Sequence, residues 1–180
     1  MDTHWNIPST DEPIAGSEAG WRAVYDQFLP RLFHYFYYKT GDAHVAEELT
    51  ASTFEKAWKN RHRYRARLGE YRFYLFGIAQ KVAVDYFRRR RPEVGLDEVG
   101  ELPGPASVEE HVEQRLDGQR LAALLRRLPE EDRTLVALKY GAELTNREIA
   151  RLTGLSESNV GTRLYRLVGR LRQEWRKNDA

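Results

Sequence analysis

The sequence predicts an all-α fold of two small helical bundles joined by a flexible acidic linker, with a helix-turn-helix in the C-terminal bundle. Apolar residues recur at helical spacings of three and four along both halves of the chain. No stretch sustains the alternation of apolar and polar residues that a half-buried strand requires. The predicted parts are a mobile acidic tail over 1–20, a first bundle over 21–91, a linker over 92–111 and a second bundle over 112–180.

Charge is segregated along the chain, although the 180 residues carry a formal net charge of only +2. Ten basic residues and two acids lie in 61–91, and eight basic residues and three acids lie in 145–177. Between them, 92–114 holds seven acids and no lysine or arginine. Two basic blocks around an acidic spacer indicate two contacts with a polyanion, with two solvated helical faces as the alternative.

Composition also excludes several classes of protein. The chain has no cysteine, which excludes disulfides, thiolate metal sites and a cysteine nucleophile. No apolar run approaches the roughly 20 residues of a membrane helix. The N-terminus lacks the basic and apolar pattern of a secretory signal. We therefore expect a soluble protein of a reducing compartment, without direct membrane insertion.

The first bundle begins with an apolar helical stripe from Trp21 to Phe36, in which Pro30 predicts a kink or a short break. Asp42 is the expected N-cap of a second helix that ends near Asn60. Residues 61–71 lack periodicity and are expected to form a loop, and 72–90 form a third helix that ends before Pro92.

The linker contains three prolines and three glycines, and the chain beyond it is helical again. One helix is expected to end before Pro129 and the next at Gly141. Thr145 and Glu148 then form a capping box, Gly154 supplies a tight turn, and Ser156 caps a long basic helix. This order predicts a helix-turn-helix whose second helix enters the major groove of DNA, with an ordinary helical hairpin as the alternative. Its exposed face would carry Ser158, Asn159, Thr162, Arg163, Tyr165, Arg166 and Arg170.

Aromatic residues are interleaved with arginines in the first basic block. Rings can stack on unpaired bases while guanidinium groups follow the phosphates, so this block suits single-stranded DNA. Tyr64 and Tyr71 lie outside the helical stripe and are the better stacking candidates, although many of the aromatics could instead belong to the core.

Four segments together resemble the extracytoplasmic-function (group IV) sigma factors of bacterial RNA polymerase, over about Trp21 to Trp175. Two of them, GDAHVAEELTASTFEKAWKN and YRFYLFGIAQKVAVDYFRRR, are similar to the region-two motifs of that family. The other two, LRRLPEEDRTLVALKY and LTNREIARLTGLSESNVGTRLYRLVGRLR, are similar to region four. The chain departs from the family pattern at Ala51-Ser52, Tyr74, Gln80-Lys81 and Gly161.

The resemblance implies three contact surfaces. Core polymerase, through the β′ clamp helices, would contact Glu47, Glu48, Ala51, Ser52 and Glu55. The −10 promoter element, opened to expose the non-template strand, would contact Arg63, Tyr64, Arg65, Arg67, Tyr71, Arg72, Gln80, Lys81, Arg88 and Arg89. The duplex −35 element would contact Thr145, Ser158, Asn159, Gly161, Thr162, Arg163, Tyr165, Arg166 and Arg170.

The resemblance also implies partners and a setting. Further partners would be the polymerase β flap and an inhibitory anti-sigma factor, and the protein would act in the bacterial cytoplasm in a stress or envelope-signal response. It implies no cofactor, no metal and no enzymatic activity.

Two other classes of function stay open from the residues alone. One is a self-contained DNA-binding regulator that uses only the C-terminal helix-turn-helix. The other is an enzyme. The five histidines argue against it, because they are scattered along the chain without catalytic or metal-binding spacing.

Overall fold

The protein is helical throughout the part described by the computed structural model, residues 18–64, 71–90 and 110–177. The N-terminal half contains α1 (Glu18–Thr40), α2 (Ala43–Lys59), the 3₁₀ turn η1 (Arg61–Arg63) and α3 (Tyr71–Arg90). The C-terminal half contains α4 (Glu110–Arg126), α5 (Glu130–Val136), the π-helical turn η3 (Ala137–Gly141), α6 (Asn146–Thr153) and α7 (Glu157–Lys177). No strand occurs within these residues, and the predicted all-α class is confirmed.

Helix ends follow the expected capping chemistry. The Asp42 carboxylate accepts a hydrogen bond from the amide of Val45 at 3.0 Å, and α2 ends against Asn60 as predicted. The predicted break at Pro30 does not occur, because α1 runs through it. Pro30 and Asp26, whose carbonyl loses its helical partner, both lie on the exposed side of α1, where water can bind that carbonyl.

Two predicted boundaries differ slightly from the structure. The first helix begins at Glu18, inside the stretch expected to be a tail, and α4 begins at Glu110, inside the expected linker. Apolar periodicity marks the buried face of a helix, and the polar first turns of these two helices carry little of it. Residues 1–17 and 91–109 lie outside the described residues.

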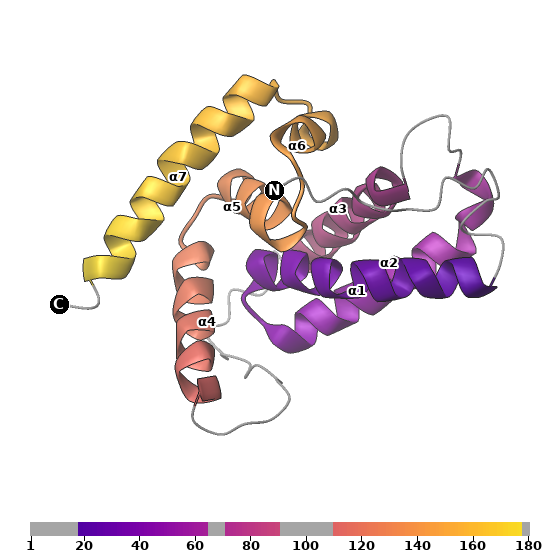
Figure 1. The fold of residues 1–180 in the computed structure, drawn as a ribbon, viewed down its shortest axis with the longest axis horizontal. Helices are drawn as coiled ribbons and strands as arrows, with labels where there is room; N and C mark the ends of the chain where they lie inside the picture. Colours follow the sequence, from indigo (N-terminus) through magenta and orange to yellow (C-terminus); the bar gives the residue numbers. More distant parts are fainter. Residues whose placement is uncertain (1–17, 65–70, 91–109, 178–180) are drawn as a thin grey trace.

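The core extends from one half of the chain into the other. Phe28, Leu32 and Phe36 of α1 pack with Leu75 and Phe76 of α3. The same cluster continues through Ala137, Leu138, Ala142, Leu144 and Ile149 of the C-terminal half. In Figure 1 the orange turn after α5 lies against α1, and α6 lies beside α3. The two bundles are therefore in direct contact, an arrangement that the sequence does not predict.

Candidate nucleic-acid interface

The helix-turn-helix is built as the sequence predicts. The Thr145 hydroxyl accepts from the amide of Glu148 at 3.3 Å, and the amide of Thr145 donates to the Glu148 carboxylate at 2.7 Å. Gly154 ends α6 with φ of +75°, a conformation that glycine adopts without a steric cost. Ser156 then accepts from the amide of Asn159 at 3.2 Å at the start of α7. These three devices fix the angle between α6 and α7.

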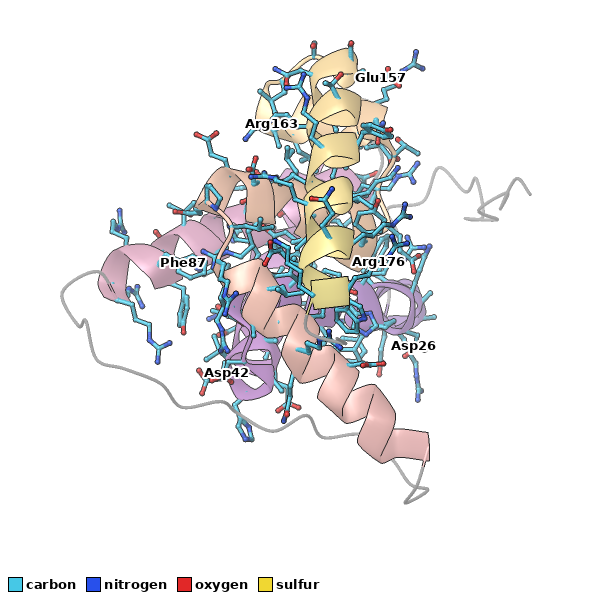
Figure 2. The ribbon with its side chains drawn as sticks, turned by 90° about the vertical axis from the view of Figure 1, so that its left-hand side faces the viewer. Asp26, Asp42, Phe87, Glu157, Arg163 and Arg176 are labelled. Atoms are coloured by element: carbon cyan, nitrogen blue, oxygen red, sulfur yellow. The ribbon has the colours of Figure 1, made fainter. Side chains whose placement is uncertain are left out.

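The long helix α7 has one buried face and one free face. Val160, Leu164 and Leu167 are buried against the rest of the C-terminal half. Tyr165 is 83% exposed. Figure 2 looks onto α7, from Glu157 at its upper end to Arg176 at its lower end, and no other described element lies in front of it. The remaining predicted −35 residues that are exposed are Thr145, Ser158, Asn159, Thr162, Arg166 and Arg170.

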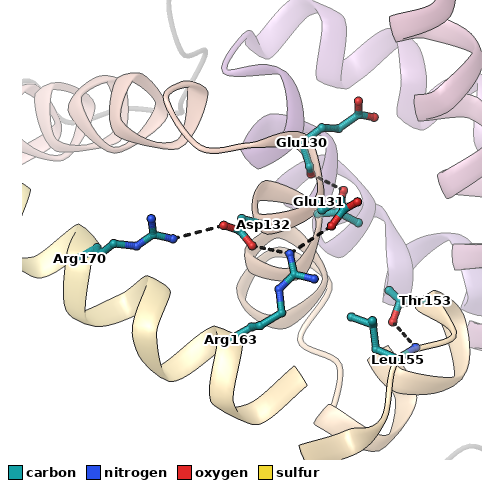
Figure 3. Close-up of polar contacts among 8 residues, drawn as sticks. Glu130, Glu131, Asp132, Thr153, Leu155, Arg163 and Arg170 are labelled. Atoms are coloured by element: carbon teal, nitrogen blue, oxygen red, sulfur yellow. Dashed lines mark hydrogen bonds and ion pairs between the residues drawn. The ribbon is translucent and has the colours of Figure 1, made fainter. Parts of the chain in front are cut away.

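Arg163 does not lie on this free face, contrary to the sequence-based expectation. Its guanidinium donates to Asp132 at 2.6 Å and to Glu131 at 3.3 Å, both on α5 (Figure 3). Arg170 reaches the other oxygen of Asp132 at 3.2 Å. The hydrogen bond that Arg163 donates to Asp132 is the main reason that the pKa of Arg163 is raised. At this position the guanidinium lies against the acidic first turn of α5 and is bound there by two carboxylates. Arg163 therefore holds α7 onto α5.

Gly161 also differs from the expected DNA-contacting role. It is half-buried, and a Cβ atom added there would lie 3.3 Å from the side-chain nitrogen of Asn146 on α6. The glycine therefore sits at the contact between α6 and α7 rather than on the face offered to DNA.

The predicted stacking residue Tyr71 is buried, with only 2% exposure. It forms a cluster with Tyr64 and Tyr74, in which ring centroids lie 5.0 to 5.7 Å apart. The Tyr74 hydroxyl donates to the carbonyl of Asn60 at 2.7 Å. Burial raises the pKa of Tyr71. The cluster thus fastens the segment after α2 onto α3. Of the two predicted stacking residues, Tyr64 and Tyr71, only Tyr64 is half-buried and has exposed ring surface on which a base could stack.

The other predicted −10 residues divide into exposed and covered ones. Arg63, Lys81, Arg88 and Arg89 are exposed along η1 and α3. Arg72 and Gln80 are half-buried beneath the C-terminal half, and Arg72 forms an ion pair with Glu148 of α6 at 2.8 Å. Arg65 and Arg67 lie outside the described residues.

The acidic face of α2 lies beside an apolar hollow. Glu47, Glu48, Ala51 and Glu55 are exposed, and Ser52 is half-exposed. Lys59 donates to Glu55 at 2.5 Å and lowers the pKa of that carboxyl. The hollow between α1 and α2 has a volume of about 460 Å³ and is lined by Tyr25, Leu29, Phe33, Glu47, Ala51 and Phe54.

Sequence reasoning missed the α1 side of this hollow. Tyr25 and Leu29 belong to the apolar stripe between Trp21 and Phe36, whose spacing does not distinguish them from core residues, and both are exposed. Their spacing of four was the available signal, because two large apolar residues at that spacing form one continuous patch whether or not another helix covers them.

Comparison with known proteins identifies two regions in the chain. Residues 24–93 match the family described as sigma-70 region 2, and residues 118–171 match sigma-70, region 4. SigL of Mycobacterium tuberculosis, an ECF RNA polymerase sigma factor, is 30% identical over 160 residues, which cover 88% of this chain and 90% of SigL. The chain belongs to the ECF family of RNA polymerase sigma factors. The region 2 match of this sigma factor begins within α1 and includes α2 and α3, and the region 4 match begins within α4 and ends within α7.

Other relatives have the same description. The ECF sigma factor BldN of Streptomyces coelicolor is 29% identical over 157 residues, which cover 86% of this chain and 60% of BldN. SigM of Bacillus subtilis is 28% identical over 151 residues, with 83% and 91% covered. The sigma factor thus spans three fifths of BldN but most of SigM and SigL.

Two solved structures share the fold. One is CnrH in complex with the cytosolic domain of CnrY, with a TM-score of 0.69, 19% identity, and 92% of this chain and 93% of that chain covered. The other is the sigma factor RpoE in complex with the anti-sigma factor NepR from Bartonella quintana, with a TM-score of 0.68, 20% identity, and 85% and 94% covered.

Sigma factors of this family recognise promoters and initiate transcription with RNA polymerase, which is the function of this chain. In the part of the sigma factor that the structure describes, no helix is both long and apolar enough to cross a membrane. The described side chains also form no cluster of three or more metal-binding residues.

Proposed function

We propose that this sigma factor divides promoter recognition between its two regions, with α7 reading the duplex −35 element and α3 with η1 contacting the opened −10 element. The main support for the proposal is the free basic face of α7. A recognition helix that enters a major groove has the same features, which are a capped start, exposed arginines and a buried apolar stripe. Arg166, Thr162 and Tyr165 are the residues of that face best placed to meet base edges.

The proposed −10 surface combines cations with a ring. Arg63, Lys81, Arg88 and Arg89 supply exposed positive charge that can follow phosphates. Tyr64, held by Tyr71 and Tyr74 behind it, can stack on an unpaired base of the non-template strand. Opening the duplex costs a few kcal/mol per base, which stacking and phosphate contacts can offset.

The acidic face of α2 and the adjoining hollow form the proposed contact with core polymerase. Acids that flank an apolar groove suit a helix with basic and apolar side chains, and the β′ clamp helices would bind there. Region 4 would contact the β flap. An anti-sigma factor would compete for these surfaces. The protein would act in the bacterial cytoplasm, in a response to stress or envelope signals. We propose that the chain contributes no catalysis of its own.

Reconstituted transcription tests this function. The purified chain is added to core RNA polymerase with fragments of its source genome, and transcripts are mapped. We expect initiation at a limited set of promoters only when both proteins are present. No binding to core and no initiation at any promoter would refute the proposal, and tight specific binding to duplex DNA without polymerase would favour a self-contained regulator.

The polymerase contact has its own matched test. Glu48→Arg reverses a charge on the proposed surface, and we expect weaker binding to core polymerase. Asp117→Arg makes the same change at an exposed position on α4, outside that surface, and should leave binding unchanged. Equal loss in both variants would show that only net charge matters.

A further inference from the structure

We propose that Tyr74 of α3 is a positioning residue for the −10 element, because its hydroxyl holds the turn η1 where Tyr64 can offer its ring to an unpaired base. In this role Tyr74 contacts no DNA itself. The inference rests on the proposed stacking role of Tyr64 and adds the residue that fixes the ring. It is supported by the hydrogen bond of the Tyr74 hydroxyl, by the packing of the tyrosine rings and by a second anchor of η1.

The Tyr74 hydroxyl binds the carbonyl at which η1 begins. It donates to the carbonyl oxygen of Asn60 at 2.7 Å. The same oxygen accepts from the amide of Arg63 at 2.8 Å, and this second hydrogen bond closes the turn. A 3₁₀ turn of three residues has few hydrogen bonds of its own, and their geometry is poorer than in an α-helix. A bond from α3 to its first carbonyl therefore helps to fix where the turn lies.

The residue that follows η1 is Tyr64, and its ring packs on the rings of Tyr71 and Tyr74. The centroids of Tyr64 and Tyr71 are 5.0 Å apart with an angle of 73° between the ring planes, an edge-to-face contact that aromatic rings favour. The centroids of Tyr64 and Tyr74 are 5.7 Å apart. Tyr71 is buried, whereas Tyr64 is only half-buried and retains ring surface on which a base can stack.

Tyr71 and Tyr74 support Tyr64 in different ways. The Tyr71 hydroxyl is buried and has no hydrogen-bond partner among the described residues, so Tyr71 acts through the packing of its ring. The Tyr74 hydroxyl has a partner, and a hydrogen bond constrains direction as well as distance. Burial raises the pKa of Tyr74, although Arg63 opposes the shift, and the hydroxyl therefore remains a donor at neutral pH.

The turn η1 is also fastened to α2. The guanidinium of Arg61 lies over the ring of Trp58 at 4.0 Å and donates to the Trp58 carbonyl at 2.9 Å. Trp58 packs in turn on Trp21 of α1, with ring centroids 5.0 Å apart. Arg61 thus ties η1 to α2, and Tyr74 ties it to α3.

The tie to α3 sets the Tyr64 ring relative to the cations proposed to bind phosphates. Lys81 and Arg88 are exposed on α3. A strand that stacks a base on Tyr64 while its phosphates meet these cations needs the ring and the cations at a fixed separation. The hydrogen bond of Tyr74 sets that separation before the strand binds, so less ordering is required on binding.

The size of the expected effect follows from what each group contributes. A base stacked on an aromatic ring is worth about 5- to 100-fold in affinity. A neutral hydrogen bond favours the state that contains it by about two- to tenfold. Apparent affinity falls with the population of the binding-competent state. Loss of the Tyr74 hydroxyl should therefore remove part of the stacking contribution, and loss of the Tyr64 ring should remove all of it.

An abasic scan of the opened −10 element tests this role. Holoenzyme is assembled from core polymerase and each variant, and its binding is measured on a mapped promoter held open by a mismatched template strand. Single bases of the non-template strand are replaced in turn by abasic sites. The base that stacks on Tyr64 is the one whose loss weakens binding of the unmodified chain but not of Tyr64→Leu, which keeps an apolar side chain and lacks the flat ring.

Tyr74→Phe keeps the ring and removes only the hydroxyl. We expect it to bind the intact strand about two- to tenfold more weakly than the unmodified chain. On the strand with the abasic site opposite Tyr64, the two should bind equally, because no base is left for the ring to meet. Tyr74→para-aminophenylalanine returns a donor to the same position and should restore binding to the intact strand.

Tyr86→Phe is the matched control on the same helix. It removes a hydroxyl that accepts a hydrogen bond from Arg90, roughly 18 Å from Tyr74 along α3 at about 1.5 Å per residue. We expect unchanged binding to both strands. Circular dichroism of each purified chain checks that the helical fold is retained.

The outcomes separate this role from the function on which it rests. If no abasic position distinguishes the unmodified chain from Tyr64→Leu, the stacking role of Tyr64 is wrong and the positioning role of Tyr74 falls with it. If one position does, and Tyr74→Phe binds the intact strand as tightly as the unmodified chain, the positioning role alone is overturned. A loss that is equal on intact and abasic strands, or that para-aminophenylalanine does not restore, would show that the hydroxyl does not act through the ring.

Discussion

Two arginines of α7, three residues apart, have different roles in this structure. Arg163 is bound to Asp132 and Glu131 and is 29% exposed, whereas Arg166 is exposed on the free face. The same side chain therefore serves the fold at one position and is available for recognition at the other.

Replacing each arginine by alanine should separate these roles. We expect Arg166→Ala to weaken binding of the −35 duplex by about 1–3 kcal/mol with an unchanged free energy of unfolding. Arg163→Ala should lower the free energy of unfolding by about 1–3 kcal/mol, since charged hydrogen bonds to a largely buried carboxylate are lost.

Urea unfolding and holoenzyme binding to a mapped promoter measure the two effects. The interpretation would be wrong if Arg163→Ala bound DNA more weakly at full stability. Uniform loss across all duplex sequences in Arg166→Ala would instead make that residue a phosphate contact.

Single residues also show where sequence reasoning stops. The capping roles of Asp42, Thr145 and Ser156 depend on neighbours within a few positions and were predicted. The burial of Tyr71 depends on Tyr64 and Tyr74, which a linear pattern does not place around it. The partner of Arg163 lies 31 residues away, so no helical spacing could indicate it.

At the scale of the element, the turn between α6 and α7 depends on Gly154. An alanine there must adopt the left-handed conformation. We expect Gly154→Ala to lower the free energy of unfolding by about 1–2 kcal/mol.

Gly169→Ala is the matched control on α7. Nothing lies within 4 Å of an added Cβ at this helical position, so we expect stabilisation by about 0.5–1 kcal/mol. Chemical denaturation of both variants checks the pair. A common sign for the two changes would contradict the distinct conformations assigned to these glycines.

Helices themselves were largely predictable because their signals are local. Periodicity and caps located α1, α2, α3, α6 and α7 to within a few residues. Pro30 was misjudged as an interruption, because its effect depends on whether the freed carbonyl faces water. The π-helical turn η3 had no sequence signal beyond Gly141, since the helix ends there and no later turn can display the shift in apolar phase that an extra residue causes.

At the scale of the whole molecule, one buried cation lies in the contact between the regions. Lys39 of α1 is 3% exposed and donates to Thr134 of α5 at 2.7 Å, with Glu130 3.9 Å away and the ring of Phe87 at 5.3 Å. Burial, reinforced by Arg133 and opposed by Glu130, lowers the pKa of Lys39 to about 8 from 10.5.

The sign of this shift predicts how stability depends on pH. Between pH 8 and 10.5 the unfolded chain binds more protons at Lys39 than the folded one, so the folded state gains stability as pH rises. Below pH 8 the full cost of burying the charge is present. We expect Lys39→Met to remove this slope and, at pH 7, to be neutral or stabilising by up to about 3 kcal/mol.

Unfolding curves at several pH values test this expectation. Thr134 remains satisfied in the variant, because its hydroxyl also donates to the carbonyl of Glu130. Lys59→Met, at an exposed lysine, should leave the slope unchanged. A large loss of stability in Lys39→Met would show that its polar contacts outweigh desolvation.

Promoter binding as a whole should depend steeply on salt. Exposed cations on α3 and α7 release counterions when they meet phosphates, and six to ten such contacts lower affinity about 10³- to 10⁵-fold between 50 and 200 mM salt. Holoenzyme binding at several salt concentrations measures this loss. A flat dependence would remove both basic surfaces from the interface.

The two regions could be predicted from the sequence, but their contact could not. Arg31, Lys39 and Gly141 each have an ordinary local explanation as a surface cation or a helix end. Their role depends on partners more than 90 residues away.

Asp132 fixes the orientation of the recognition helix α7 before any duplex binds. One carboxylate, 15% exposed, accepts hydrogen bonds from two guanidinium groups that lie two turns apart on α7, and so restrains rotation of the helix about its axis. Ordering a long side chain on association costs about 0.5–1.5 kcal/mol. Arg170, which belongs to the proposed −35 surface, is already held by Asp132 in the free protein, so less side-chain entropy is lost when α7 meets a duplex.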